Sequence, residues 1–112
     1  MNPTQFDIFA RALPFVSVRC KIPMSVIDSP SRTAPIVFAR SVLIHILRTQ
    51  AGMTLIEIGT LLNRHHTAIL AALRSLDVAV QTNCAMGRQA AALIAEFSSN
   101  TEVSEPARKP RT

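Results

Sequence analysis

The positions of the seven prolines limit the fold of this chain more than any other sequence feature. Five lie between residues 3 and 35, and the other two lie at 106 and 110. Proline lacks the N–H that a helix interior needs and clashes with the preceding turn, so it breaks helices from within. Glycine, the other helix breaker, occurs only three times in 112 residues. The long middle of the chain can therefore form helices, and a loop-rich or all-β fold is disfavoured.

The length and the hydrophobic content indicate one domain. A chain of 112 residues has room for a single core, and 48% of its residues are hydrophobic. Five Phe with no Trp or Tyr make that core mainly aliphatic. We expect an all-α fold, a compact bundle of about five or six helices over residues 1–97. Beyond it the sequence turns polar and contains Pro, which predicts a disordered tail over residues 98–112.

The positive charge is concentrated in one part of the chain. The formal net charge is +5, but residues 11–74 hold eight basic side chains against two acidic ones. Such a local excess of cations favours a polyanionic partner, although solubility alone is the simpler explanation. The lack of Trp and Tyr argues against a protein that stacks on single-stranded bases.

Nothing in the chain indicates secretion or a membrane. Cys20 and Cys84 have no repeated spacing, and we interpret them as reduced, partly buried thiols. The first ten residues lack the cationic start of a signal peptide. The most apolar stretch, residues 36–47, is interrupted by Arg40 and His45 and is too short to span a bilayer. We expect a cytoplasmic, nucleoid-associated protein.

The first third of the chain predicts short elements broken by prolines. Asn2 and Thr4 are candidate N-caps for a first helix, and Pro14 either kinks this helix or begins a second segment that ends at Cys20. A short helical turn is expected from Met24, and residues 28–35 read as a loop.

A long helix is predicted next, from about Ala34 to Thr49. Apolar residues nearly surround it, so most of it should be buried. Ser41, His45 and Arg48 follow one another at spacings of four and three, which predicts one exposed cationic stripe.

The next segment carries the signals of a helical hairpin with a tight turn. Gly52 is suited to end the long helix, and Thr54 with Glu57 forms a capping-box pattern at the start of a helix that runs to about Leu62. Asn63 tolerates the left-handed backbone that a sharp turn needs.

A second helix then begins at Arg64 or His65, and another is expected from Ala85 to Phe97. The two helices over residues 54–80 have the helix-turn-helix layout, and Gly59 lets the second helix pack close to the first. The free amides at the start of the second helix suit phosphate, and first-turn side chains can reach base edges in the major groove.

The order of residues in this hairpin resembles a known family. The runs Leu55-Ile-Glu-Ile-Gly59 and Leu62-Asn-Arg-His-His-Thr67 resemble the signature of the DNA-binding domain of the bacterial replication initiator DnaA. Ala39-Arg40 matches an Ala-Arg or Pro-Arg pair of the family at the same distance from Glu-Ile-Gly. The resemblance covers about residues 15–82 and implies a helix-turn-helix that binds double-stranded DNA.

The resemblance implies roles for four residues that precede or begin the hairpin. Arg32 lies where the family inserts an arginine into the minor groove. Arg40 and Arg48 match cations that touch phosphate, and Leu55 matches a residue close to the DNA.

Within the hairpin, Arg64 matches the turn arginine, and His66 with Thr67 matches the pair that reads bases. We include His65 among the expected DNA-binding residues, although it replaces an aspartate of the family and should therefore remove a helix N-cap. Ala68 replaces a second threonine. These departures favour DNA binding over recognition of the same site as the initiator.

Other chemistry is not expected. The chain has no Gly-x-x-x-x-Gly-Lys-Ser/Thr loop, so we expect no nucleotide binding and no ATPase activity. His65 and His66 point about 100° apart on a helix and have no third ligand nearby in the sequence, which argues against a metal site. We expect no enzyme activity and no cofactor.

Sequence-specific binding of double-stranded DNA, in the control of replication initiation or transcription, is thus the predicted function. Two other classes remain open. The chain could be a protein-interaction module whose Ala85–Phe97 helix binds a replication protein or a second copy, or a helix-turn-helix regulator of an unrelated type. Salt-dependent binding to duplex DNA would separate a DNA-binding protein from an adaptor.

Overall fold

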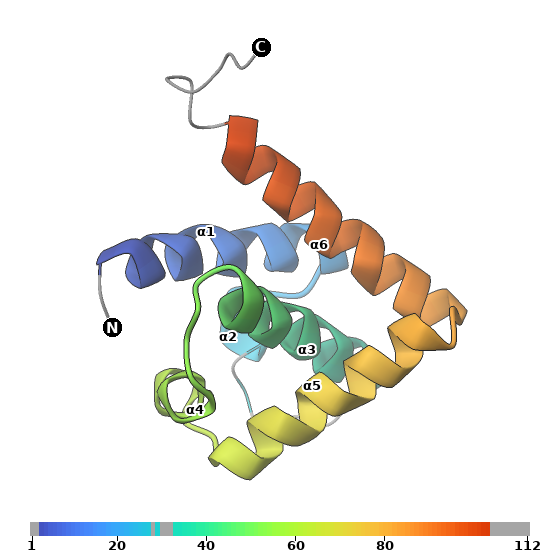
Figure 1. Ribbon diagram of the computed structural model, residues 1–112, viewed down its shortest axis with the longest axis horizontal. Helices are drawn as coiled ribbons and strands as arrows, with labels where there is room; N and C mark the ends of the chain where they lie inside the picture. Colours follow the sequence, from blue (N-terminus) through green and yellow to red (C-terminus); the bar gives the residue numbers. More distant parts are fainter. Residues whose placement is uncertain (1–2, 28, 30–32, 104–112) are drawn as a thin grey trace.

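The described secondary structure of the computed structural model is entirely helical (Figure 1). The structure describes residues 3–27, 29 and 33–103. Six helices lie within these residues: α1 (Pro3–Cys20), α2 (Met24–Ile27), α3 (Ala34–Thr49), α4 (Leu55–Leu62), α5 (His66–Gln81) and α6 (Ala85–Val103). The predicted all-α bundle is confirmed. None of the described helices has the length and apolar character needed to cross a membrane.

α1 continues through Pro14 as one helix. Of the two alternatives for Pro14, a separate segment that begins there is wrong, because the helix continues through it. Pro14 and Ala10 are both exposed, so the carbonyl that loses its helical partner can bond to water. Thr4 lies inside the helix and not at its cap, while Asn2 lies outside the described residues.

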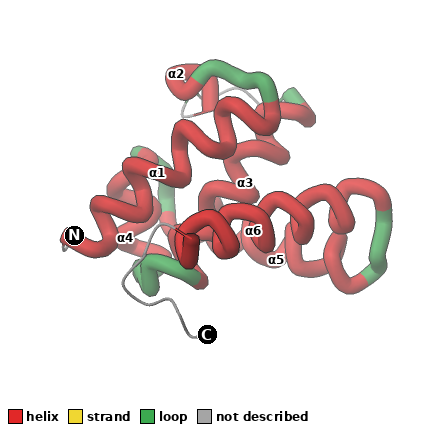
Figure 2. The backbone as a smooth tube through the Cα atoms, turned by 90° about the horizontal axis from the view of Figure 1, so that it is seen from above, coloured by secondary structure: helices red, strands yellow, loops and turns green. Residues whose placement is uncertain are grey.

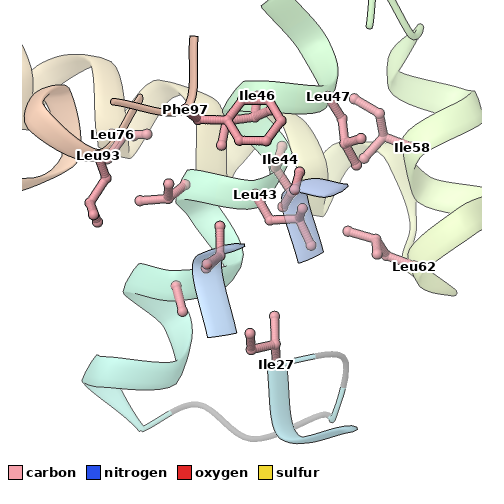
Figure 3. Packing of buried hydrophobic residues seen from close by; sticks show 14 of the residues in the cluster. Ile27, Leu43, Ile44, Ile46, Leu47, Ile58, Leu62, Leu76, Leu93 and Phe97 are labelled. Atoms are coloured by element: carbon pink, nitrogen blue, oxygen red, sulfur yellow. The ribbon is translucent and has the colours of Figure 1, made fainter. Parts of the chain in front are cut away.

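α3 is the central helix of the bundle, with the bounds that the sequence predicts. In the core, its side chains lie between those of α4 and those of α5 and α6 (Figure 3). α1 also packs against α3. The expected exposed stripe is wrong at Ser41, which is only 8% exposed, and His45 is half-buried, whereas Arg48 is exposed. α5 packs against α3 and covers this side of the helix.

α5 and α6 meet at a sharp corner (Figure 1), overlap in a perpendicular view (Figure 2) and pack against each other. A Cβ atom on Gly87 would lie 2.0 Å from the carbonyl oxygen of Ala79, so only glycine allows this approach. α6 also packs on α1, where the rings of Phe15 and Phe97 are 5.4 Å apart.

α6 extends beyond its predicted end at Phe97 and reaches Val103. Residues 98–103, which the sequence predicts as part of the tail, belong to this helix, and they contain no Pro or Gly that would end it. Residues 104–112 lie outside the described residues. Cys20 is half-buried and Cys84 is exposed, and both are free thiols, so the expected burial is wrong for Cys84.

Candidate nucleic-acid interface

The first helix of the hairpin begins with the capping box that the sequence predicts. The Thr54 Oγ1 accepts a hydrogen bond of 3.1 Å from the Glu57 backbone N–H. In return, the Thr54 N–H donates to the Glu57 Oε1 at 2.8 Å. Two amides at the start of α4 are thereby satisfied, which fixes where this helix begins. Gly52 lies just before it with φ of +68°, in the left-handed region.

The turn between α4 and α5 depends on Asn63 and Gly59. Asn63 has φ of 57° and ψ of 48°, which confirms the predicted left-handed residue. The Arg64 N–H donates to the Gly59 carbonyl at 2.7 Å. A Cβ atom on Gly59 would lie 2.5 Å from the Arg64 carbonyl oxygen. Gly59 thus permits a close approach, as predicted, and the approaching group is the backbone of the turn that leads into α5.

α5 begins at His66, and His65 is its N-cap. The His65 Nδ1 accepts a hydrogen bond of 3.2 Å from the Thr67 backbone N–H and lies 2.8 Å from the Thr67 Oγ1. The prediction that His65 removes the cap is therefore wrong. A neutral imidazole that carries its proton on Nε2 presents a lone pair on Nδ1, and this lone pair replaces the carboxylate oxygen of an aspartate cap.

The first turn of α5 lies at the surface. His65, His66 and Thr67 are exposed, and the two imidazole rings stack with centroids 4.5 Å apart. An open hollow of about 470 Å³ lies beside them and is lined by Ile56, Gly59, Thr60, Asn63, Arg64, His65 and His66. The hairpin therefore presents a helix N-terminus, polar side chains and a concave surface together.

Of the residues that line this hollow, Gly59 and Asn63 were predicted only as turn residues, and Ile56 and Thr60 were not singled out by the sequence. Ile56 and Thr60 are exposed, and Ile56 is exposed to 66%. Their spacing of four places both on the outer face of α4, away from the buried Ile58 and Leu62. The signal in the sequence that could have found this pair was an isoleucine, Ile56, on the face of the helix that points away from the core.

The structure connects Arg40 and Arg64 through one carbonyl oxygen. The Arg40 Nε donates to the Ile27 carbonyl at 3.0 Å, and its Nη2 donates to the Ser29 carbonyl at 2.6 Å. The Arg64 Nη2 donates to the same Ser29 oxygen. Two arginines that the sequence assigns to DNA therefore bond to the backbone next to α2.

The remaining predicted residues lie apart from this pair or outside the described residues. The Arg48 Nη1 donates to the Met53 carbonyl at 2.9 Å, just before α4. Leu55 is half-buried against the core. Arg32 lies outside the described residues. Arg64, His65, His66 and Thr67 are thus brought together, and Arg40 is joined to them through Ser29.

One half-buried histidine lies elsewhere, on α3. The Nδ1 of His45 is buried and has no hydrogen-bond partner among the residues that the structure describes. Burial lowers the pKa of His45 below its ordinary value, and the negative charge of Asp77 opposes part of this effect. Among the described residues, no three His, Cys, Asp or Glu side chains gather in a way that could hold a metal ion.

Comparison with known proteins agrees with this geometry. The family described as the bacterial DnaA protein helix-turn-helix matches residues 11–76, which is more than half of the chain. The chain belongs to this family. Residues 11–76 of this DnaA helix-turn-helix protein include the whole turn and most of α5, so the predicted resemblance is confirmed. The match supports DNA binding as the function of the domain.

A solved structure shares the fold. The crystal structure of a DNA replication initiation factor matches the DnaA helix-turn-helix chain with a TM-score of 0.74 and 20% sequence identity. The match covers 87% of this chain and 30% of the other, so this chain spans less than a third of that protein. A search of curated proteins gives no match.

Proposed function

We propose that this DnaA helix-turn-helix protein binds double-stranded DNA sequence-specifically, in the control of replication initiation or transcription. The observation that carries the proposal is the exposed first turn of α5 with His66 and Thr67. A helix N-terminus attracts phosphate through its free amides and its dipole. Side chains of the first turn can then form contacts with base edges in the major groove.

The proposed base contacts come from His66 and Thr67. Imidazole can donate to an acceptor on guanine or thymine, and a threonine methyl can pack on the thymine methyl. The Thr67 Oγ1 lies 2.8 Å from the His65 Nδ1, which restricts the rotation of the Thr67 side chain. His65 therefore supports His66 and Thr67, which we call the reading pair, in addition to its own proposed contact with DNA.

Backbone contacts are proposed for the flanking residues. Arg48 is exposed, and its guanidinium has donors beyond the one bonded to Met53, so it can also contact phosphate. Leu55 and Arg32 stay proposed contacts on the family resemblance. Arg40 and Arg64 are also implied by it, but both guanidinium groups donate to backbone carbonyls within the protein.

The first experiment selects bound duplexes from a random pool and measures their affinity across a range of salt concentrations. If about four to six charges are neutralised, the log–log slope of affinity against salt should be about −4 to −5. The same sequence as a single strand serves as the control. A slope near zero, or tighter binding to the single strand, would contradict the proposal.

The second experiment tests which residues read sequence. His66→Ala or Thr67→Ala should cost about 1–3 kcal/mol on the selected duplex and relax the preference at one or two base pairs. Thr82→Ala, at the other end of α5, is the matched control and should leave both quantities unchanged. Equal losses for Thr67→Ala on selected and unrelated duplexes would mean that α5 does not read bases.

The adaptor hypothesis makes a different prediction. The apolar residues Ala90, Leu93 and Phe97 of α6 are buried within this chain, so a partner or second copy would have to use the opposite face, which carries Arg88, Ala92 and Ala95. Contact through α6 stays a prediction. An adaptor would show no salt-dependent duplex binding.

A further inference from the structure

All three polar backbone and side-chain groups of Ser29 are hydrogen-bonded. Its N–H donates to the Val26 carbonyl at 3.0 Å, and its hydroxyl donates to the same oxygen at 2.6 Å. Its own carbonyl accepts from Arg40 and Arg64. Ser29 lies two residues after the end of α2, and Ile27, the last residue of α2, is buried in the core with 1% exposed. The Ser29 oxygen is therefore a fixed point on the body of the protein.

The two arginines that bond to this oxygen come from different elements. Arg40 lies in α3, whose backbone is held by the core, and it also binds the Ile27 carbonyl. Arg64 lies 35 residues from Ser29 in the sequence, between the C-cap of α4 and the N-cap of α5. The Ser29 oxygen thus joins α3 to the turn from which the exposed helix of the interface begins.

We propose that Arg40 and Arg64 are positioning residues, which hold the start of α5 at a fixed place relative to α3 by sharing the Ser29 carbonyl oxygen. The proposal rests on the proposed function, because its consequence is the placement of His66 and Thr67 in the DNA groove.

Backbone connectivity transmits the position of Arg64 to the reading pair. The Arg64 N–H bonds to Gly59, and its carbonyl packs against the same glycine, so its Cα is fixed on the α4 side. His66 begins α5 two residues later. If the Arg64 side chain loses its anchor on Ser29, only the turn itself sets the direction of α5 near its start. A small rotation there displaces both reading side chains.

Arginine suits this role, and lysine does not. The planar guanidinium has donors in a fixed fork, so Arg40 can bind the Ile27 and Ser29 carbonyls together. A carbonyl oxygen has two lone pairs and can accept from both arginines. Lysine keeps the positive charge but offers a single ammonium on a flexible stem. Exchange of arginine for lysine therefore separates anchoring from charge.

The test compares three charge-conserving variants on the selected duplex and on an unrelated duplex. Arg40→Lys and Arg64→Lys should each lower the ratio of specific to nonspecific affinity about tenfold, the loss of one charge-assisted hydrogen bond, with the salt slope unchanged. Arg74→Lys, at an exposed arginine of α5 with no proposed DNA contact, is the matched control and should keep the ratio within about twofold. Wild-type specificity in both Arg40→Lys and Arg64→Lys would overturn the proposal.

A double variant and a direct probe of the oxygen complete the test. Because both arginines act through one atom, Arg40→Lys with Arg64→Lys should be no worse than about the poorer single variant. In the free protein, the carbonyl ¹³C resonance of Ser29 should move in each single variant and stay in place in Arg74→Lys. Additive losses in specificity, or an unmoved Ser29 resonance, would contradict a shared anchor.

The two proposals fail in different ways. If the wild-type protein shows no salt-dependent duplex binding, the proposed function is wrong and the positioning role falls with it. If it binds and the lysine variants keep full specificity, only the positioning role is wrong. A thermal melt of each variant shows whether it is folded. If Arg40→Lys does not fold, Arg64→Lys alone tests the positioning role, because the Arg64 side chain of the wild type bonds to the same Ser29 oxygen.

Discussion

At the residue scale, the start of α5 depends on an imidazole where Asp, Ser, Thr and Asn are the usual caps. The His65 Nδ1 bonds to the Thr67 N–H, and the neighbouring His66 stacks on its ring. One side chain thereby ends the turn, begins the helix and restricts a residue of the proposed reading pair. This arrangement explains how the protein can lack the aspartate of its family and still have an N-cap at the start of α5.

The cap predicts a measurable loss of stability. His65→Ala should lower the free energy of unfolding by about 1 kcal/mol, the usual cost of removing a cap, whereas His65→Asp should retain the wild-type value or exceed it. Urea denaturation measures both. His66→Ala is the control, because His66 is equally exposed but caps nothing, and its effect should stay within about 0.5 kcal/mol. Equal stabilities for His65→Ala and His66→Ala would mean that His65 is not a cap.

His45 predicts how stability depends on pH. Burial lowers the pKa of His45 in the folded protein below its ordinary value of 6.5, partly opposed by Asp77. As the pH falls below 6.5, the unfolded chain therefore binds a proton that the folded protein does not take up. The free energy of unfolding contributed by His45 is thus fully present above 6.5 and is lost as the pH falls through the folded pKa.

His45→Gln removes this titration and keeps a polar, helix-compatible side chain at the site. Urea denaturation between about pH 5 and pH 7 should show a smaller loss of stability on acidification for His45→Gln than for the wild type. Other titrating groups are common to both proteins and cancel in the difference. Parallel curves over this range would contradict the predicted shift.

At the element scale, the two glycines around α4 serve different purposes. A Cβ atom on Gly52 would meet nothing within 4 Å, but the backbone has a φ of +68°. Gly52→Ala should therefore cost only the left-handed strain, about 1–2 kcal/mol. Gly59→Ala places a methyl group 2.5 Å from a backbone oxygen that cannot move without the turn.

Gly59→Ala should cost about 2–3 kcal/mol in spite of the better helix propensity of alanine, because overpacking against a backbone is not relieved by a side-chain rotation. It should also reduce specific DNA binding, whereas Gly52→Ala should reduce stability alone. Urea melts and duplex affinities for both variants give the comparison. A Gly59→Ala protein with wild-type stability would show that the turn can shift freely.

The sequence predicted the elements whose signals are local. The bounds of α3, the capping box of Thr54 and the left-handed Asn63 follow from propensity, caps and backbone sterics, and all three are confirmed. The buried Ser41 and the continuous helix through Pro14 could not be predicted in this way. They depend on which face of each helix is covered by a neighbour, and that is decided by packing between distant segments.

The residues of the candidate site divide in the same way, into neighbours in the sequence that could be predicted and contacts between distant segments that could not. Arg64, His65, His66 and Thr67 are adjacent in the sequence and could be predicted as one group. The bond from Arg64 to the Ser29 carbonyl spans 35 residues and has no sequence signal of its own. The cap formed by His65 was missed because histidine is an unusual cap, although its Nδ1 can accept a hydrogen bond like a carboxylate oxygen.

At the scale of the whole molecule, the fold extends beyond the part that matches the family. The family match ends at residue 76, but Ala90, Leu93 and Phe97 of α6 belong to the core. Phe97 contacts Phe15 of α1, and Arg19 of α1 pairs with Glu96. α6 therefore connects the first helix to the hairpin that carries the proposed reading pair.

This connection makes a prediction about a shortened chain. Removal of residues 83–112 exposes the core surface that Leu93 and Phe97 cover, and each of these side chains contributes about 1.5–3 kcal/mol by burial. The total is a large share of the roughly 5–15 kcal/mol that stabilises a domain of this kind. The shortened chain should therefore melt at least about 12 °C lower than the full chain in a circular dichroism experiment, or not fold at all.

Leu93→Ala in the full chain is the milder test, with an expected loss of about 2–5 kcal/mol in the free energy of unfolding. Duplex binding, corrected for the folded fraction, should persist in Leu93→Ala, because the residues of the hairpin are intact. A shortened chain that melts cooperatively at the temperature of the full chain would show that the family-matched segment is a complete domain and that α6 adds nothing to its core.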